Sequence, residues 1–294
     1  MITRATLTIP LLAGLVACGE PDSVTADRYS DPDRLFSIVD SNVASNEQLE
    51  KIVEIDHSRL GAEAGSVMPP ARVLLFSNPA LESQLVAINP LIAVDLPMRV
   101  LAYEMPTDGS SRVIHNSFDY LSSRYGLDAL PEIETAYSET MLVAIEGIGA
   151  DQVTTFTDDS MQPDGITTLE SPFDFEETVR RVTEAIDAQD DTVWFGRVDF
   201  QARAQAQGIE VSPTLLLLFG GPAPGAKAMA SAPTLGLDAF CQKFVVWQDA
   251  AGVVRLSFND LLDVADRQQV SKSVALRIIN RRLTSTFREA LEEP

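Results

Sequence analysis

Val73-Leu74-Leu75-Phe76-Ser77-Asn78-Pro79 and Leu216-Leu217-Leu218-Phe219-Gly220-Gly221-Pro222 are two versions of one segment, 143 residues apart in a chain of 294. Each is a continuous apolar run that ends in a turn and a proline. Such a run, bounded by a turn, is typical of a strand that is buried on both faces. Proline is favourable at the first position of a helix, because the N–H there has no partner in the helix. We therefore expect a buried strand, a tight turn and a helix in each version.

The same spacing relates residues on both sides of these two segments. Glycine and proline matches at one constant spacing do not follow from shared composition, so the chain is a tandem duplication. We predict a first repeat domain at 30–150, a linker at 151–164 and a second repeat domain at 165–294. The matching pairs are Asp56/Asp199, Gly65/Gly208, Pro70/Pro213, Pro90/Pro233, Asp95/Asp238, Gly109/Gly252, Arg112/Arg255 and Asn116/Asn259.

Helices and strands are both expected within each copy. A helix is predicted to open at Asp31-Pro32, because an aspartate cap followed by proline favours a helix start. Gly109 and Gly252 each lie in a short turn between two strand-like segments, which indicates hairpins. Residues 254–259 alternate between apolar and polar side chains, so one face of that hairpin is expected to meet the core.

The first eighteen residues have the pattern of a bacterial export signal. Arg4 is their only charge, and the apolar stretch that follows is shorter than the roughly 20 residues of a membrane-spanning helix. Leu15-Val16-Ala17-Cys18 resembles a lipobox, in which the cysteine thiol receives a diacylglycerol and the signal is cut before that cysteine. We predict a lipoprotein signal peptide at 1–17, lipidation of Cys18 with fatty acyl chains such as palmitate, and a flexible tether at 18–29.

These features predict a protein of the bacterial cell envelope that faces the periplasm and contacts the membrane through its N-terminal lipid. Several acyl chains give stable anchoring where one chain binds only marginally. Gly19, in place of an aspartate after the cysteine, favours the outer membrane over the inner one. The mature chain carries 43 acidic and 21 basic residues, a net charge of −22. Such an acidic protein repels phosphate backbones, which excludes nucleic acid as a partner.

Four ordered motifs in the first copy resemble the domain of unknown function 302 family. They are Asp-His at 56–57, Phe-Ser-Asn-Pro at 76–79, Asp-Leu-Pro-Met-Arg at 95–99 and Asn-Ser-Phe-Asp-Tyr at 116–120, and the second copy keeps part of each. The resemblance implies an α+β fold with two homologous tandem domains, each a mainly antiparallel sheet covered by helices, packed as a pseudo-dimer. It implies no assigned activity and no cofactor.

Asp56, His57 and His115 are the candidate catalytic or metal-binding residues. A carboxylate beside an imidazole can work as an acid–base pair or, with a second histidine, hold a metal. The second copy keeps the aspartate but has Phe200 and Phe258 in place of the histidines. This pattern favours a helix cap for Asp56 and core packing for His115. A site that depends on the histidines would be confined to the first copy.

Polar residues that occur in both copies are candidate ligand contacts. A carboxylate with a nearby cation could bind a ligand, although an ion pair at the surface or at a domain interface is the more common arrangement and contributes little. The asparagines are more typical of a turn into the next helix. The set consists of Asp95, Arg99, Asn116, Asp238, Lys243 and Asn259.

Duplicated structural residues without a duplicated catalytic set favour a binding module over an enzyme. Cys241 has no disulfide partner once Cys18 is lipidated, and we expect it to be buried. The leading hypothesis is a lipid-anchored envelope protein whose two repeats pack on each other and bind a small molecule or an envelope protein. The alternative is an enzyme or metal-binding protein with a single site in the first repeat.

Overall fold

The computed structural model describes residues 22–127, 129–156 and 165–292. The predicted signal peptide and Cys18 lie outside these residues. The first repeat contains α1 (Asp22–Ala44), β1 (Glu50–Asp56), α2 (His57–Glu63), β2 (Ala71–Ser77), α3 (Pro79–Ile88), the 3-10 helix η1 (Pro90–Asp95), β3 (Met98–Glu104), β4 (Ser111–Asn116), α4 (Phe118–Tyr125), α5 (Pro131–Ala144), η2 (Ala150–Gln152) and β5 (Val153–Phe156).

The second repeat follows the same order from α6 onward, after one additional strand. It contains β6 (Ile166–Glu170), α6 (Phe175–Asp187), β7 (Val193–Asp199), α7 (Phe200–Ala206), β8 (Thr214–Gly220), α8 (Pro222–Met229), η3 (Pro233–Gly236), β9 (Gln242–Gln248), β10 (Val254–Asn259), α9 (Leu261–Arg267) and α10 (Val274–Ala290). No helix among the described residues combines the length and the hydropathy needed to cross a membrane.

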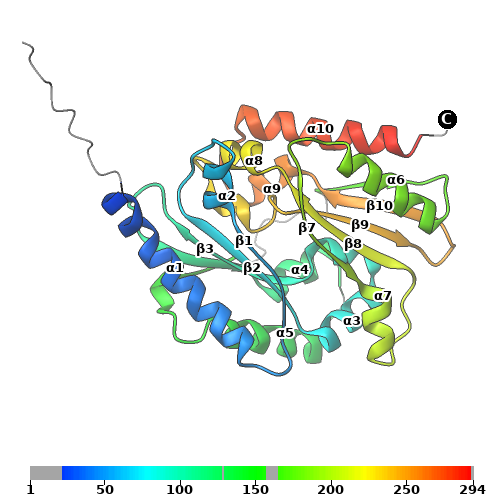
Figure 1. Cartoon of the computed structure of the whole chain (residues 1–294). Helices are drawn as coiled ribbons and strands as arrows, with labels where there is room; N and C mark the ends of the chain where they lie inside the picture. Colours follow the sequence, from blue (N-terminus) through cyan, green and yellow to red (C-terminus); the bar gives the residue numbers. More distant parts are fainter. Residues whose placement is uncertain (1–21, 128, 157–164, 293–294) are drawn as a thin grey trace, which may run out of the picture.

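Two five-stranded sheets form the centre of the molecule, with helices on their outer sides (Figure 1). The first sheet has the order β1-β2-β3-β4-β5, and the second has the order β7-β8-β9-β10-β6. Neighbouring strands are antiparallel, except that β5 runs parallel to β4. The expected α+β architecture with two homologous tandem domains is confirmed. Equivalent bulges, between Lys51 and Val53 in β1 and between Trp194 and Gly196 in β7, extend the similarity to local irregularities.

The apolar runs that mark the duplication are the buried strands β2 and β8. In each of them one residue is partly exposed and the other six are buried. β3 is buried at all seven positions, because it has α1 of its own repeat as a neighbour as well as η3 of the other repeat. Asn78 caps α3 by accepting a hydrogen bond from the backbone N–H of Leu81, as a tight turn into a helix requires.

Two segments that the sequence suggests are irregular contain regular structure. α1 begins at Asp22 and not at Asp31, so Pro32 lies inside the helix and much of the expected 18–29 tether is helical. Arg28 forms an ion pair with Glu104 of β3, which fixes this part of α1 to the first sheet. The expected linker at 151–164 opens with β5, which adds to the edge of the first sheet. Local composition does not reveal the early start of α1 or the strand β5, because the residues that contact them lie on β3 and β4.

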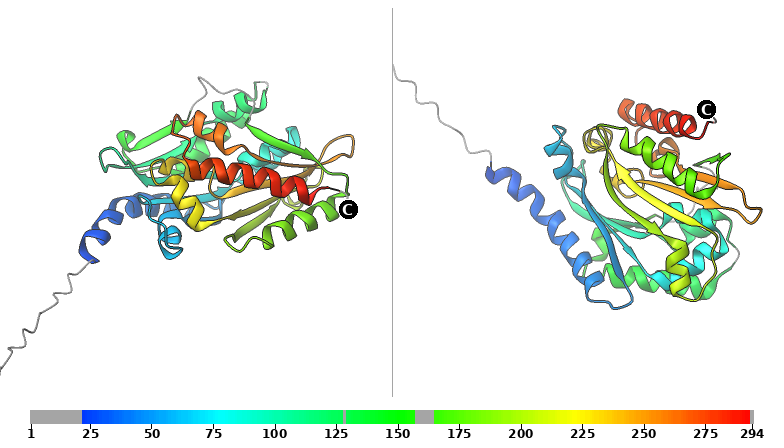
Figure 2. Two further views of the ribbon diagram at one scale, coloured as in Figure 1. Left: turned by 90° about the horizontal axis from the view of Figure 1, so that it is seen from above. Right: turned by 45° about the vertical axis from the view of Figure 1, so that its right-hand side comes forward.

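The two repeats meet through a pseudo-twofold interface (Figure 2). α2 packs against α8 and α3 packs against α7, and these contacts are equivalent because α2 corresponds to α7 and α3 to α8. η1 lies against β8, β9 and β10, whereas η3 lies against β2 and β3. Each repeat therefore places a short 3-10 helix on the sheet of the other. The α2–α8 contact is so close that a Cβ on Gly61 would lie 2.4 Å from the Cβ of Ala226.

Candidate functional site

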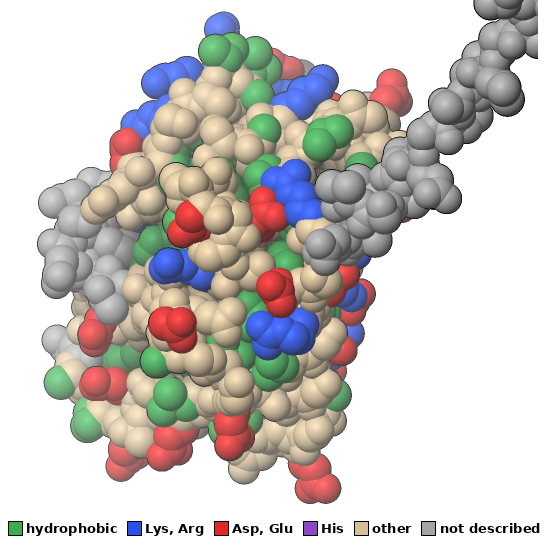
Figure 3. Space-filling model, turned by 90° about the vertical axis from the view of Figure 1, so that its left-hand side faces the viewer, with side chains coloured by type: hydrophobic (Ala, Val, Ile, Leu, Met, Phe, Trp, Pro, Cys, Tyr) green, Lys and Arg blue, Asp and Glu red, His purple; other side chains and the backbone are tan. Residues whose placement is uncertain are grey.

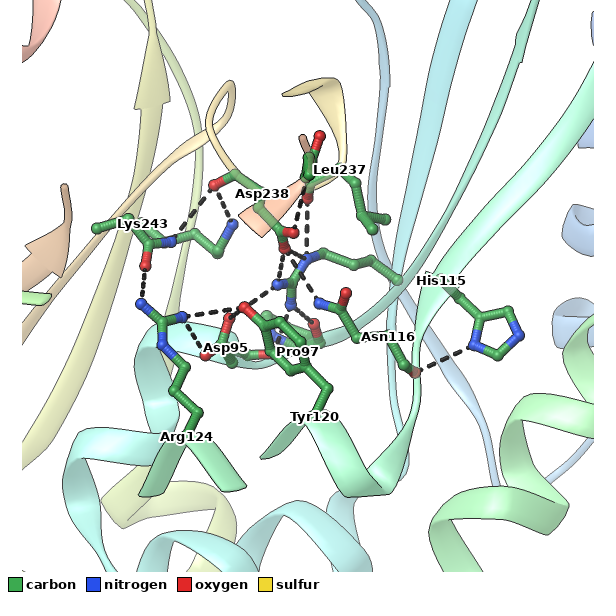
Figure 4. A network of polar contacts seen from close by, with 12 residues as sticks. Asp95, Pro97, His115, Asn116, Tyr120, Arg124, Leu237, Asp238 and Lys243 are labelled. Atoms are coloured by element: carbon green, nitrogen blue, oxygen red, sulfur yellow. Dashed lines mark hydrogen bonds and ion pairs between the residues drawn. The ribbon is translucent and has the colours of Figure 1, made fainter. Parts of the chain in front are cut away.

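A cluster of buried charged and amide side chains lies where the two repeats meet (Figure 4). Its centre is Arg99 of β3, which is only 3% exposed. Nε of Arg99 donates to the carbonyl oxygen of Leu237 at 2.9 Å and to Oδ1 of Asp238 at 3.0 Å. Nη2 donates to Oδ1 of Asp95 at 3.0 Å, and it also pairs with Asp238. One guanidinium thus joins the end of η1 to the segment that follows η3.

Arg124 of α4 makes the second set of contacts across the interface. Its Nη1 donates to Oδ2 of Asp95 at 2.5 Å, and its Nη2 donates to Oδ1 of Asn259 at 2.7 Å. The hydroxyl of Tyr125 donates to the same Asp95 oxygen at 2.7 Å. Sequence reasoning missed Arg124 and Tyr125. A signal was present for Arg124, because Arg267 stands 143 residues after it.

The two asparagines belong to this cluster and do not cap the helices that follow them. Nδ2 of Asn116 donates to Oδ1 of Asp238 at 3.2 Å. Oδ1 of Asn259 accepts a hydrogen bond from Nη2 of Arg124. Ser117 caps α4 and Asp260 caps α9. The predicted role of the asparagines in the turn is therefore wrong, because the next residue in each copy already supplies the capping oxygen.

Electrostatics in the cluster are set by burial and by the excess of cations around two carboxylates. Burial acts to raise the pKa of Asp95, but the charges of Arg124 and Arg99 outweigh it and hold the pKa below its ordinary value. The pKa of Asp238 is likewise lowered, by Arg99 and Lys243 against the effect of burial. Burial and repulsion from Arg99 lower the pKa of Lys243 to about 8. Its Nζ donates to the carbonyl oxygen of Asp238 at 2.9 Å.

The six residues proposed from the sequence as ligand contacts are therefore brought together as partners of one another. The ion pairs lie at the domain interface and are buried. The sequence pattern alone could not tell a buried pair at the interface from an exposed pair at the surface. Removing one member of a buried pair leaves an unpaired charge in a medium of low dielectric constant. The cluster is thus expected to contribute much more than the small amount typical of an exposed pair.

Asp238→Asn should lower the free energy of unfolding by about 3–5 kcal/mol, because Arg99 would stay buried without its full counter-charge. The matched control is Asp191→Asn, since Asp191 pairs with Arg282 and both side chains are 41% exposed. We expect the control to cost less than about 1 kcal/mol. Urea unfolding of the purified variants measures both values, and equal losses would contradict the interpretation of the cluster.

Asp56 and His57 have structural partners. Oδ1 of Asp56 accepts a hydrogen bond from the backbone N–H of Arg59, and Asp199 caps α7 in the same way. The prediction of a helix cap is confirmed. His57 is buried against the second repeat, where its Nε2 donates to the carbonyl oxygen of Gly236 at 3.1 Å. A Cβ on Gly236 would lie 2.8 Å from the ring, so the glycine permits this approach.

His115 lies far from Asp56 and His57. Asp56 is paired in register with Arg72, then with Ala102 and then with Val113, two residues before His115. Three strand spacings of about 4.8 Å separate β1 from β4 by roughly 14 Å. A metal that binds its ligands at about 2 Å cannot join groups so far apart. In the part of the chain that the structure describes, no three His, Cys, Asp or Glu side chains are grouped to hold a metal.

A pocket of about 640 Å³ lies beside His115, between α5 and the edge of the first sheet at β4 and β5. Its walls are mostly apolar, and its polar groups are few. Figure 4 shows the ring of His115 pointing away from the interface cluster, toward a neighbouring helix. The lining residues are His115, Ser117, Phe118, Tyr137, Ser138, Met141, Leu142, Ile145, Glu146, Gly147, Ile148, Ala150, Val153 and Thr155.

The second repeat has different chemistry at the equivalent positions. Phe258 replaces His115, and its ring stacks on Phe244 with the centroids 4.3 Å apart. The helix wall changes as well: Asn280, Thr284, Ser285 and Arg288 replace Tyr137, Met141, Leu142 and Ile145. Asn280 is buried and donates to Asp260, while its oxygen accepts from the backbone N–H of Leu261. The apolar pocket is therefore a specialisation of the first repeat.

His115 has a hydrogen-bond partner for each ring nitrogen. Nδ1 donates to the carbonyl oxygen of Asn116 at 3.0 Å, and Nε2 accepts from the hydroxyl of Thr155 at 3.2 Å. Burial lowers the pKa of His115, which fits a neutral ring with this tautomer. The hydroxyl of Tyr137 donates to the same Asn116 carbonyl at 3.3 Å. The polar groups in the floor of the pocket thus position one another.

Both histidines should make the protein less stable in acid. Burial lowers the pKa of His57 from 6.5 to about 4 and also lowers the pKa of His115. Below pH 6.5 the unfolded chain takes up protons that the folded chain does not, so the stability present above pH 6.5 falls as the pH drops toward 4. Each histidine contributes a slope of up to about 1.4 kcal/mol per pH unit.

Unfolding measured at a series of pH values should therefore show a shallower acid slope for His57→Leu and for His115→Phe than for the wild type. Glu82, whose pKa burial raises to about 7, acts in the opposite direction in all three proteins and cancels in the comparison. Identical slopes would show that the histidines titrate with the same pKa in the folded and unfolded states, which would contradict the effect of burial.

Cys241 is buried as expected, at 4% exposure. Burial raises the pKa of its thiol to about 12, so it stays protonated near neutral pH. It lines a cavity of only about 20 Å³ together with His57 of the other repeat. Neither the volume nor the protonated thiol suits a reactive site.

Comparisons with known proteins place both repeats in one group. The sequence profile of the family described as domain of unknown function DUF302 matches residues 26–147 and again residues 167–292. The chain is 35% identical over 115 residues to the fluoride-specific ion channel FluC 1 of Brucella suis biovar 1, a segment that covers 38% of this chain and 44% of that protein. FluC 2 of Brucella melitensis biotype 1 is also 35% identical over 115 residues, with 38% of this chain and 42% of that protein covered.

The chain thus spans less than half the length of these curated relatives. Among solved structures, the crystal structure of an uncharacterized conserved protein DUF302 from Bacillus stearothermophilus aligns with a TM-score of 0.37. The identity is 17%, and the alignment covers 43% of this chain and 95% of the other.

Proposed function

The chain belongs to the family of domain of unknown function DUF302, and we propose that it is a lipid-anchored protein of the bacterial cell envelope that binds a small, largely apolar molecule beside His115. The pocket in the first repeat carries this proposal. Its volume of about 640 Å³ falls within the range of roughly 300–1,000 Å³ that is usual for small-molecule sites. Apolar walls with a few fixed polar groups are also typical of such sites.

The geometry favours binding over catalysis. Both nitrogens of His115 and the hydroxyl of Tyr137 make hydrogen bonds to protein groups, which gives them a structural role in the pocket. The alternative of one enzyme or metal site built from Asp56, His57 and His115 is disfavoured by the separation of β1 from β4. Glu146 at the pocket and the net charge of −22 favour a neutral or cationic ligand over an anion.

The lipobox-like segment that ends at Cys18 supports the membrane anchor. Three residues separate Cys18 from Asp22, where α1 begins. Even a fully extended spacer of this length would reach only about 14 Å. The folded protein would therefore stay close to the membrane, on its periplasmic side, with the outer membrane favoured by Gly19.

Cys18→Ala should abolish lipid attachment when the full chain is expressed in a bacterium that processes lipoproteins. The wild type should incorporate a labelled palmitate analogue and sediment with membranes, because the thiol of Cys18 is the acceptor. Cys241→Ala is the matched control and should keep the label, since that thiol is buried. Labelling and membrane fractionation that survive Cys18→Ala would refute the anchor.

Ile145→Arg should block the pocket, because it introduces at this wall the residue that the second repeat carries as Arg288. We expect a neutral fluorescent probe, N-phenyl-1-naphthylamine, to bind the wild type and to bind this variant about tenfold or more weakly, since a charge must be buried. The control is Ile88→Arg, because Ile88 is 48% exposed and does not line the pocket. Equal binding by all three proteins would show that the probe does not occupy this pocket.

A further inference from the structure

We propose that the outer surface of α8 and the first half of α10 docks on a membrane that contains anionic lipids. We call this surface the basic face; it consists of Lys227, Val274, Arg277, Ile278 and Arg281. The inference rests on the proposed anchor, because the lipid on Cys18 would hold the protein while the basic face sets its orientation. A membrane surface is the occupant that suits both parts of the face, its cations and its exposed apolar side chains.

The basic face combines exposed apolar side chains with cations on one side of a helix. Val274 is 73% exposed and Ile278 is 62% exposed, although both are large apolar residues. Arg277 and Arg281 are exposed beside them, and residues three and four apart are neighbours on a helix surface. The opposite side of α10 is buried through Leu276, Leu283 and Phe287. The helix is therefore amphipathic, but its outer side has the composition of a face that contacts a lipid surface.

The cations of the basic face have no acidic partner among the residues that the structure describes. Arg282, the next residue after Arg281, forms an ion pair with Asp191. Arg277, Arg281 and Lys227 take part in none of the ion pairs found in residues 22–127, 129–156 and 165–292. Unpaired cations in a chain with a net charge of −22 leave a local positive surface that complements anionic headgroups.

Figure 3 shows the charge arrangement on the end of the molecule where α1 begins. Basic side chains gather on its upper part, the side of α10, and acidic side chains dominate its lower edge. α8 lies between α2 and α10 and contacts both. The uneven distribution gives the protein a side that an anionic surface attracts and a side that it repels.

The range of the electrostatic interaction explains how an acidic protein can present such a face. Charges in solution are screened beyond about 8 Å at physiological ionic strength. A membrane next to the basic face therefore interacts mainly with the charges of that face, and carboxylates more than this distance away are screened. The short spacer after Cys18 keeps the folded protein close to the membrane. This raises the effective concentration of the basic face at the lipid surface and favours docking.

The test couples the chain from residue 18 onward, through the thiol of Cys18, to a maleimide lipid in vesicles. Cys241 is buried and does not compete for the maleimide. The vesicles contain brominated phosphatidylcholine as a fluorescence quencher, with or without phosphatidylglycerol. Ile278→Trp reports on the basic face, and Ile88→Trp is the matched control, because Ile88 of α3 is 48% exposed and does not line the pocket beside His115. The background fluorescence of the native Trp194 and Trp247 is measured with the protein that carries no introduced tryptophan.

Quenching of Ile278→Trp should be strong on vesicles with phosphatidylglycerol and weak without it, and Ile88→Trp should not respond. Adding Arg277→Glu and Arg281→Glu should lower the docking equilibrium on the order of 30-fold, by the loss of two surface cations. Equal quenching at the two positions, or no effect of the charge reversals, would overturn the proposal. A dimer in solution that the charge reversals dissociate, without quenching, would assign the face to a second copy instead.

This experiment supplies the tether chemically, so it does not depend on lipidation in the cell. Failure of palmitate labelling would refute the anchor and leave a positive quenching result in place. Failure of quenching, with palmitate labelling intact, would refute the docking face alone.

Discussion

Arg99 is the side chain on which the assembly of the two repeats depends. Its guanidinium is buried in the first repeat, but its carboxylate partners come from both repeats. If the repeats separated, Arg99 would lose Asp238 and keep only Asp95, and Asp238 would lose its ion pair with Arg99. This loss costs far more than the loss of an exposed ion pair. The two domains are therefore expected to behave as one cooperative unit.

The exchange of η1 and η3 between the sheets has the same physical basis. Asp95 ends η1, and Asp238 follows η3, so each 3-10 helix delivers a carboxylate to the interface. The cations that receive them come from β3, α4 and β9. The charged residues therefore gather at the pseudo-twofold axis between the repeats. In a homodimer the residues on the two sides of such an axis would be identical, whereas a duplicated chain can carry different residues there. Arg99 in one half corresponds to Lys243 in the other, and only Arg99 reaches both carboxylates.

Duplication also allowed the repeats to divide their roles. The second repeat is filled with aromatic rings around Phe244, whereas the first repeat has His115 and a pocket in the corresponding region. A polar ring that needs Asn116 and Thr155 as partners packs less tightly than a phenylalanine stack. The first repeat has a pocket where the second repeat has packed aromatic rings.

Sequence patterns predicted those features that depend on neighbours in the chain. The strand-turn-helix units, the cap at Asp56, the burial of Cys241 and the repeat itself follow from spacing and local chemistry. β5 and the early start of α1 did not, because the residues that stabilise them, in β4 and at Glu104, are distant in sequence. The sequence pattern also assigns Asn116 and Asn259 to turns, because it reports only the neighbours of a residue in the chain. Their actual partners lie in the other repeat, and no local pattern reports a contact between residues more than a hundred positions apart.

The position of Arg99 and Asp238 in the chain has a consequence for the order of events during synthesis. Arg99 is made 139 residues before Asp238. At about 5–20 residues per second, that interval lasts roughly 7–30 s. Throughout it, Arg99 lacks its carboxylate partner from the second half, and η3 does not yet cover the sheet of the first half. The nascent first half therefore cannot complete its core, and the chain commits to its native state only when the second half arrives.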